Sequence, residues 1–250
     1  MIAAGRAAQN GRAAGDAVRL AMRRGPVPDA RHLRVVTFHP VGPETLVDAA
    51  LRETCLPALL GRDGIVDAWA GRKGSRSDPR RVLVTTWVDA PSDSTTSAPA
   101  MGAPAEAANA HDDQPDAPDL ATLHAITSAG TSLTIDTSLA VELAVHLRFD
   151  RPEPARILRV FYGTVRRGEL DAYVADARTG SMADAVVNDG LVAFALGPAA
   201  ADAFVTVSAW TGWPAIEEAT GGNTRVPIAT RNAIRLTGFE VSHFELLPIG

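Results

Sequence analysis

The sequence predicts an α+β protein built from two tandem modules, each with the element order β-α-β-β-α-β. Three observations predict this fold: the two halves of the chain repeat one another, each half alternates strand-like and helix-like segments, and each half contains a strand that ends in tryptophan. A chain of 250 residues is long enough for two modules of ordinary domain size.

The internal repeat becomes visible when the two halves are aligned. Three segments recur in the same order: LRVVTF from Leu33 and LRVFYG from Leu158, DGIVDAWAG from Asp63 and DGLVAFALG from Asp189, RVLVTTW ending at Trp87 and FVTVSAW ending at Trp210. Their offsets are 125, 126 and 123 positions. A fourth match, of Glu142 with Glu240, has an offset of 98, and a 25-residue insertion in the first copy explains the drop. We therefore expect an internal duplication.

Each copy begins with a strand and a helix. Apolar, β-branched runs at 33–38 and 157–162 predict the two first strands. Apolar residues then recur at helical spacing over 46–60 in the first copy and over 170–186 in the second. Glycines follow both stretches and predict the helix ends.

Each copy continues with a hairpin, a short helix and a last strand. These elements are predicted at 65–70, 82–88, 120–128 and 139–148 in the first copy, and at 191–196, 204–210, 214–220 and 236–246 in the second. Glycine and proline between the hairpin strands suit a turn. The complete order is that of the ferredoxin-like module, whose helices cover one face of its sheet. Since the other face must also be buried, we expect the two modules to pack sheet to sheet, as an α/β barrel.

Two segments fall outside the repeat. Residues 1–30 are basic and rich in alanine, and we expect an N-terminal arm that is either helical or disordered. Residues 89–119 consist mainly of Pro, Ala, Ser and Asp and predict a solvated, low-complexity insertion. The predicted modules are therefore 31–150, which contains the insertion, and 155–250. Between Val82 and Leu147 there are nine Asp and Glu and no Lys or Arg, so the net charge of −5 belongs largely to this region.

Composition excludes several classes of protein. A hydrophobic fraction of 46% excludes a wholly disordered chain, and the single cysteine excludes a disulfide scaffold. No apolar stretch is long enough to span a membrane, and the negative net charge argues against a general nucleic-acid binder. We expect a cytoplasmic protein with no membrane or nucleic-acid partner. The 23 arginines against one lysine indicate a GC-rich bacterial genome. No metal-binding or nucleotide-binding motif occurs.

Two segments of the second half carry a family resemblance. FVTVSAWTGWPAIEEATGG at 204–222 and GFEVSHFEL at 238–246 resemble the antibiotic-biosynthesis-monooxygenase-like modules of the dimeric α/β-barrel superfamily. Such modules have a strand ending in tryptophan, a helix with a second aromatic residue, and a last strand. The resemblance covers 155–250 well and 31–149 more loosely, and it implies the same fold. Its members include cofactor-independent oxygenases that form quinones, haem-degrading oxygenases, and proteins without a known reaction.

The tryptophan strands supply the candidate ligand-binding residues. Because alternate residues of a strand face opposite sides, Thr85 shares a face with Trp87, and Thr206 and Ser208 share a face with Trp210. This face is the more polar one in the second copy, so we expect it to line a cleft between the modules, with the valine face against the helices. An apolar cleft with a few hydroxyls suits a flat aromatic ligand. Alternatively, both tryptophans are core residues.

Histidine and arginine supply the remaining candidates. His243 and His39 lie on predicted strands and are the candidate general bases. Arg159, at the position equivalent to Arg34, either pairs with Glu240 at the sheet or binds an anion in the cleft. The resemblance implies an Asn, Trp and His set in haem-degrading members. The first strands of this chain have no Asn, and no His follows either tryptophan at a distance of about ten residues. Haem is therefore disfavoured, and we expect no cofactor.

Two functions remain open. In the first, the chain is a cofactor-independent monooxygenase-like enzyme that acts on an aromatic, polyketide-like molecule. The substrate is deprotonated, its carbanion reduces dioxygen, and the protein supplies a base, a dry cleft and orientation. In the second, the chain is a non-catalytic protein of the same fold that binds a small molecule or acts in assembly. A small aromatic molecule is the expected partner, and a homodimer is a further expectation.

Overall fold

The structure is a computed structural model that describes residues 29–74, 78–89, 121–123, 132–181, 188–228 and 231–248. The predicted N-terminal arm up to residue 28 and the insertion from residue 90 onward lie outside the described residues, as does the short helix of the first copy after residue 123. Two compact units are distinguished: the first unit contains residues 28–143 and 244–250, and the second unit contains residues 144–243.

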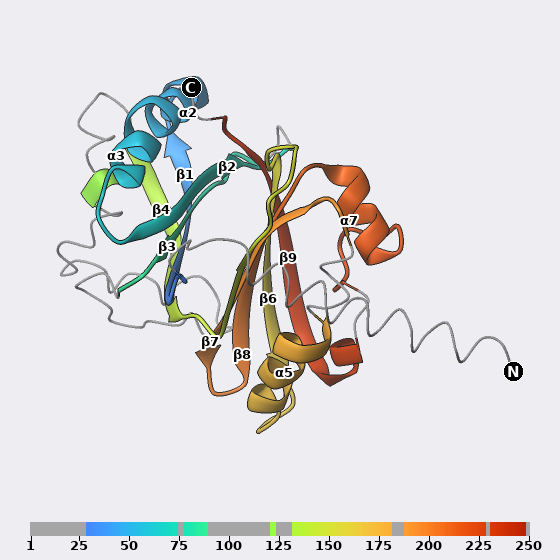
Figure 1. Cartoon of the computed structure of the whole chain (residues 1–250). Coiled ribbons are helices and arrows are strands. Elements are labelled where there is room, and N and C mark those ends of the chain that lie inside the picture. The colour runs from blue at the N-terminus through green and yellow to red at the C-terminus, as the bar shows by residue number, and fades with distance from the viewer. Residues whose placement is uncertain are drawn as a thin grey trace, which may run out of the picture. The chain divides into compact units, whose positions relative to one another are not determined.

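The first unit is an antiparallel sheet with helices (Figure 1). Its elements are β1 (His32–Val41), α2 (Glu44–Ala50), the π-helical turn η1 (Leu51–Cys55), α3 (Leu56–Leu60), β2 (Ile65–Arg72), β3 (Arg81–Trp87) and β4 (Ser132–Glu142). The strand order is β4-β1-β3-β2, which is the ferredoxin-like order. The end of the last strand of the chain lies next to β2, with Gly71 opposite Leu246.

The second unit repeats this architecture. Its elements are β5 (Val145–Arg148), β6 (Ile157–Val165), α5 (Leu170–Asp176), the π-helical turn η3 (Ala177–Ser181), β7 (Leu191–Ala200), β8 (Ala203–Trp210), α7 (Trp213–Thr220), the 3₁₀ turn η4 (Arg231–Arg235) and β9 (Leu236–Leu246). Its strand order is β9-β6-β8-β7-β5. The first four strands again follow the ferredoxin-like order, so the predicted α+β fold is confirmed. The sheet-to-sheet packing of the two units stays a prediction.

The two sheets correspond residue by residue. Trp87 lies opposite His32 of β1 and Ile65 of β2, and Trp210 lies opposite Ile157 of β6 and Leu191 of β7. The equivalent residues are therefore 125, 126 and 123 positions apart, as the sequence matches indicate. A β-bulge follows both Ile65 and Leu191. A shared irregularity of this kind supports the predicted duplication, because bulges have no reason to coincide in unrelated sheets.

The last strands are aligned differently from the prediction. The N–H of Ala144 donates to the carbonyl of Leu196, and the N–H of Leu247 donates to the carbonyl of Ala70. Because Leu196 and Ala70 are equivalent, Ala144 corresponds to Leu247, an offset of 103 rather than 98. The predicted match of Glu142 with Glu240 is therefore wrong by five positions. Weak sequence matches in alternating strands do not fix a register, since several registers preserve the same alternation.

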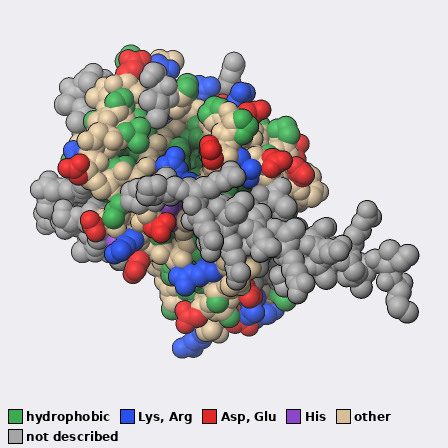
Figure 2. Space-filling view, in the orientation of Figure 1, with side chains coloured by type: hydrophobic (Ala, Val, Ile, Leu, Met, Phe, Trp, Pro, Cys, Tyr) green, Lys and Arg blue, Asp and Glu red, His purple; other side chains and the backbone are tan. Residues whose placement is uncertain are grey.

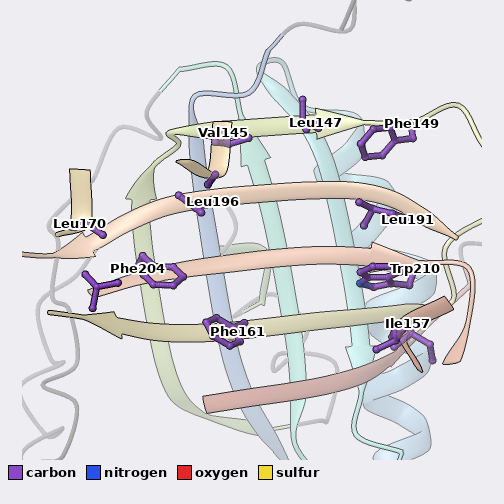
Figure 3. Packing of buried hydrophobic residues seen from close by; sticks show 13 residues of the cluster. Val145, Leu147, Phe149, Ile157, Phe161, Leu170, Leu191, Leu196, Phe204 and Trp210 are labelled. Atoms are coloured by element: carbon purple, nitrogen blue, oxygen red, sulfur yellow. The ribbon is translucent and has the colours of Figure 1, made fainter. Parts of the chain in front are cut away.

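The core of each unit lies between its sheet and its helices. In the first unit, Phe38 and Leu83 of the sheet pack with Val47 and Leu51 of the helices. In the second unit, the corresponding cluster includes Ile157, Phe161, Phe204, Trp210 and Ile216; Figure 3 shows the side chains of Phe161, Phe204 and Trp210 on one face of β6 and β8. Burying each such side chain contributes about 2 kcal/mol to folding.

On the face drawn in Figure 2, acidic and basic side chains are interspersed rather than gathered by sign. Among the described residues, no helix has the length and apolar composition needed to cross a membrane.

Candidate functional site

Both tryptophans face the helices of their own unit, which corrects the predicted orientation. Trp87 shares a strand face with Leu83, and Leu83 packs against helix residue Val47. Trp210 packs in the cluster that contains Ile216 of α7. The tryptophan face is therefore not the helix-free face. Polarity could not reveal this, because all seven residues of β3 are buried and both of its faces are covered.

Each indole donates a hydrogen bond to the hydroxyl two residues earlier on its strand. The Nε1–H of Trp87 donates to Thr85 Oγ1 at 2.9 Å, and that of Trp210 donates to Ser208 Oγ at 2.8 Å. The tryptophans are 5% and 0% exposed, so these bonds satisfy donors that have no access to bulk water. Since the arrangement occurs at equivalent positions in both units, it belongs to the shared fold.

Arg159 is a buried cation on the helix face of the second sheet. It lies opposite Ser208, and it is 3% exposed. Its Nη2 donates to the carbonyl oxygen of Val226 at 2.7 Å, and its guanidinium carbon lies 5.4 Å from the centre of the Phe161 ring. Its Nε has no hydrogen-bond partner, and no carboxylate of the described residues pairs with it. The predicted pair with Glu240 is not formed, since the Glu240 side chain is exposed.

Burial controls the ionisation of Arg159 and of Tyr173 on α5. Burial lowers the pKa of Arg159 to about 10, and the charge of the Tyr173 phenolate opposes this fall. Burial also raises the pKa of Tyr173 to about 12, and the positive charge of Arg159 opposes this rise. At neutral pH, Arg159 is therefore a cation and Tyr173 is a neutral phenol. The two groups are close enough for each to influence the other.

A row of aromatic rings lies beside Arg159. The ring of Tyr173 stacks on that of Phe204, with centroids 4.3 Å apart, and Phe204 lies 5.8 Å from Phe161. Phe161 in turn lies 5.8 Å from Phe239 of β9. Gly163 makes room for this arrangement, because a Cβ at that position would collide with the rings of Phe204 and Phe161. The helix face of the second sheet therefore combines flat apolar surfaces with one buried positive charge.

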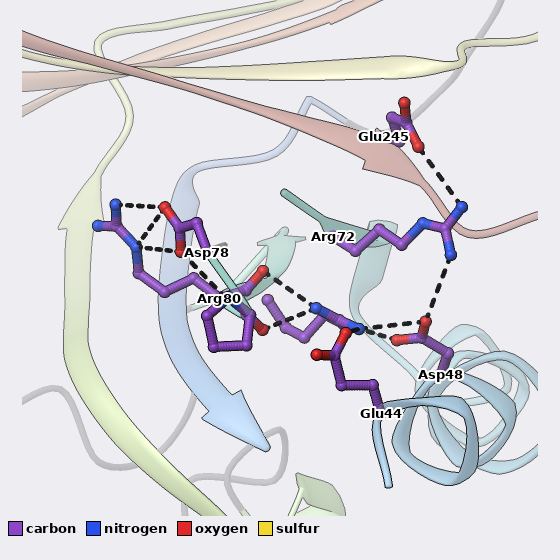
Figure 4. Close-up of polar contacts among 8 residues, drawn as sticks. Glu44, Asp48, Arg72, Asp78, Arg80 and Glu245 are labelled. Carbon is purple, nitrogen blue, oxygen red and sulfur yellow. Dashed lines mark hydrogen bonds and ion pairs between the residues drawn. The ribbon is translucent and has the colours of Figure 1, made fainter. Parts of the chain in front are cut away.

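The first unit has an arginine, Arg81, at the position equivalent to Phe204. Arg81 is 2% exposed, its Nε donates to Asp48 Oδ1 at 2.6 Å, and its Nη2 donates to Glu44 Oε2 at 2.9 Å. Figure 4 shows Glu44 and Asp48 converging from α2. Burial alone would lower the pKa of Arg81, but the hydrogen bonds to Asp48 and Glu44 reverse this and raise it. Arg81 is thus neutralised by its own helix.

The two candidate histidines occupy different environments. His39 belongs to the first unit, where its Nδ1 lies 2.7 Å from Asp136 Oδ1 and its side chain is 41% exposed. His243 belongs to the second unit, where its ring lies 5.1 Å from that of Trp213 at the start of α7. The structure therefore places His243 in the same unit as Arg159, and it does not do so for His39.

Of the predicted ligand-binding residues, four lie on the helix face of the second sheet. These are Arg159, Thr206, Ser208 and Trp210. Trp87 and Thr85 form the equivalent pair in the first unit. Sequence reasoning missed Tyr173 and Phe204. The aligned repeat could have drawn attention to both, because these two aromatic residues stand where the first copy has Val47 and Arg81.

The described residues contain no group of three or more His, Cys, Asp and Glu that could hold a metal ion. Between the sheet and the helices of the second unit, the rings of Tyr173, Phe204 and Phe161 stack directly on one another, so a flat ligand must displace at least one of these rings to enter the layer.

Several solved structures share this architecture. No protein-family model and no curated protein sequence matches the chain. A solved structure of a putative monooxygenase from Fusobacterium nucleatum superposes with a TM-score of 0.58 at 9% identity, covering 88% of this chain and 94% of that one. A putative monooxygenase from Lactobacillus acidophilus gives 0.55 at 8% identity, covering 87% and 95%.

A third solved structure, of a putative chlorite dismutase, gives a TM-score of 0.50 at 11% identity and covers 89% of this chain and 96% of that one. At these identities, the likeness concerns the fold. The chain shares the ferredoxin-like fold of these structures, so the fold implied by the sequence resemblance is confirmed.

Proposed function

We propose that the second unit binds an aromatic, polyketide-like molecule between its sheet and its helices, and that the chain oxidises this molecule as a cofactor-independent monooxygenase. The observation that carries the proposal is the row of rings from Tyr173 to Phe239 beside the buried cation Arg159. Aromatic surfaces with a few convergent polar groups suit a flat ligand. The fold shared with proteins named putative monooxygenases supports the reaction class by analogy.

The proposed reaction needs no external reductant. A methylene group activated by neighbouring rings and a carbonyl, as in an anthrone, loses a proton and becomes an enolate. The enolate transfers electrons to dioxygen, a C–O bond forms, and the resulting hydroperoxide loses water. One CH₂ group and one O₂ become one C=O group and one H₂O, with all four electrons supplied by the substrate. Arg159 would stabilise the enolate oxygen, since a preorganised cation lowers the energy of a developing negative charge.

His243 is the proposed base. Two hydrogen bonds connect β6 with β9 and with the turn before β9. Thr164 Oγ1 donates to the carbonyl of Gly238 at 3.3 Å, and the N–H of Arg166 donates to the carbonyl of Arg235 at 3.2 Å. They indicate antiparallel strands. In the first unit Arg34 lies opposite Ala140, and the offsets of 125 and 103 between the two units make Arg159 and His243 the equivalent pair. A neutral imidazole at that position would take the substrate proton.

Oxygen consumption tests the proposal. The full chain and its His243→Ala and His39→Ala variants would be mixed with anthrone, and dioxygen uptake and quinone absorbance recorded. We expect one O₂ per quinone with the wild type and with His39→Ala, and a loss of at least tenfold in rate with His243→Ala. Quinone formation no faster than in buffer would overturn the proposed activity.

One observation favours the non-catalytic alternative. Tyr173 stacks directly on Phe204, and Trp210 is 0% exposed, so the protein's own rings occupy the layer between sheet and helices. In this alternative, the second unit binds an aromatic molecule without converting it, or the fold serves assembly. Saturable binding of anthrone without dioxygen uptake would favour it. The homodimer stays a prediction.

A further inference from the structure

Arg159 has a hydrogen-bonding capacity that its surroundings leave unused. A guanidinium carries five N–H donors, and the side chain of Arg159 is 3% exposed. One donor of Nη2 reaches the carbonyl of Val226, whereas Nε is buried without a partner among the described residues. Buried arginines normally have their charge compensated by a carboxylate or a bound anion, because an uncompensated buried charge is costly.

Ser208 supplies a second donor at the same place. It lies directly opposite Arg159 in the β6–β8 pair, and side chains at opposite positions on one sheet face are neighbours. Its oxygen accepts the indole N–H of Trp210 at 2.8 Å. A serine hydroxyl that accepts one hydrogen bond still has its own O–H to donate, and the bond that it accepts makes this proton a better donor.

We propose that the Arg159 guanidinium and the Ser208 hydroxyl together bind the carboxylate of an aromatic acid. The proposal rests on the aromatic site described under Proposed function but not on its oxidation chemistry. One oxygen accepts from Nε of Arg159 and the other from Ser208, while the ring of the acid takes the place of the Tyr173 ring on Phe204.

A carboxylate fits this place better than a phosphate. Arg159 carries one positive charge, which compensates a monoanion, whereas a phosphate dianion calls for further cations. The neighbouring rings are neutral and apolar, which suits an acid whose remaining atoms are aromatic. Arg81 in the first unit offers no such place, because Glu44 and Asp48 already compensate it.

Calorimetric titration with a matched pair of probes tests the proposal. The full chain would be titrated with 2-naphthoate and with 2-naphthamide, which has nearly the same shape but no charge. We expect naphthoate to bind at least tenfold more tightly than naphthamide, since hydrogen bonds to a charged group dominate the difference. Arg159→Met should abolish this preference, and Ser208→Ala should reduce it severalfold.

Two controls separate this result from other causes. Arg80→Met removes an arginine that pairs locally with Asp78, and it should keep the full preference for naphthoate. Inorganic phosphate at equal concentration should not displace naphthoate. Equal affinity for the two probes, an unchanged preference in Arg159→Met, or displacement by phosphate would each overturn the proposal.

The outcome is independent of the proposed oxygenase activity. A preference for naphthoate that depends on Arg159, without quinone formation from anthrone, supports the carboxylate site and overturns the enzyme. Quinone formation with no preference between the probes supports the enzyme and overturns the carboxylate site.

Discussion

Arg81 and Arg159 are both buried arginines on the helix face of equivalent sheets, but only the charge of Arg81 is compensated by carboxylates. Arg81 is held by two carboxylates of α2, at 2.6 and 2.9 Å. Arg159 has one backbone carbonyl and an aromatic ring. The first arginine therefore completes a structural ion-pair cluster, whereas the second leaves a positive charge that a ligand can compensate.

The neighbouring residues show the same division between the units. Arg72 of β2 lies 3.8 Å from Asp48 and 3.5 Å from Glu245, so the cluster around Arg81 also includes the end of β9 (Figure 4). In the second unit, Phe204 replaces the arginine and stacks between Tyr173 and Phe161. One sheet uses this position for stability, and the other uses it for an aromatic surface.

Arg81→Met should have the largest effect of the substitutions that test this comparison. Glu44 is half-exposed and can turn to water, but the largely buried carboxylate of Asp48 loses its closest partner, and breaking a buried pair in this way costs about 3–5 kcal/mol. Urea unfolding at pH 7 measures the loss. Arg80→Met, which removes a half-exposed local pair, should cost less than about 1 kcal/mol. Equal losses for the two variants would show that the Arg81 cluster has no special structural role.

Gly163→Ala should have the next largest effect on the free energy of unfolding. A Cβ at this position collides with Phe204 and Phe161, and overpacking of this kind costs about 1–3 kcal/mol. The matched control is Gly61→Ala in the first unit, where φ is −81° and the nearest atom lies at 3.4 Å. Its free energy of unfolding should change by less than about 0.5 kcal/mol. A harmless Gly163→Ala would mean that the aromatic row is loosely packed.

Ser208→Ala and Thr85→Val should have the smallest effects, and the two should be equal. Each removes the acceptor of a buried indole N–H, at a cost of about 1–2 kcal/mol. Urea unfolding followed by tryptophan fluorescence measures both. A clear loss in only one variant would show that the tryptophan–hydroxyl pair is not a shared element of the two units.

The order of elements could be predicted from the sequence because the repeat in the sequence is also a repeat in the strand pairing. Trp87 and Trp210 end equivalent strands, and the offsets of 125, 126 and 123 in the sequence are those of the paired strands. Helical spacing, strand-like runs and turn residues were sufficient for this purpose. The last strands, β4 and β9, are long but carry fewer distinctive residues, and their predicted alignment was wrong.

The site was harder to predict, because it depends on which sheet face the helices cover. In β3 and in most of β8 both faces are buried, so alternation between polar and apolar residues does not distinguish them. Arg159 was recognised as a candidate, but its missing carboxylate depends on contacts between residues far apart in the sequence. Tyr173 was missed because its phenol lies on the apolar side of an ordinary amphipathic helix.

The most direct test of the difference between the two arginines is the free energy of unfolding of Arg159→Met without ligand. Burial lowers the pKa of Arg159 from its ordinary value to about 10, which corresponds to a penalty of about 3 kcal/mol for the buried charge. Because the unfolded chain holds this proton more tightly, the penalty is fully present at pH 7 and declines only as the pH rises above 10.

Arg159→Met removes this penalty together with the bond to Val226, so we predict a gain of about 1–3 kcal/mol by urea unfolding at pH 7. Arg159→Lys, which keeps a charge, should show no such gain. A loss of stability in Arg159→Met would contradict the account, because Arg159 would then be a structural cation like Arg81.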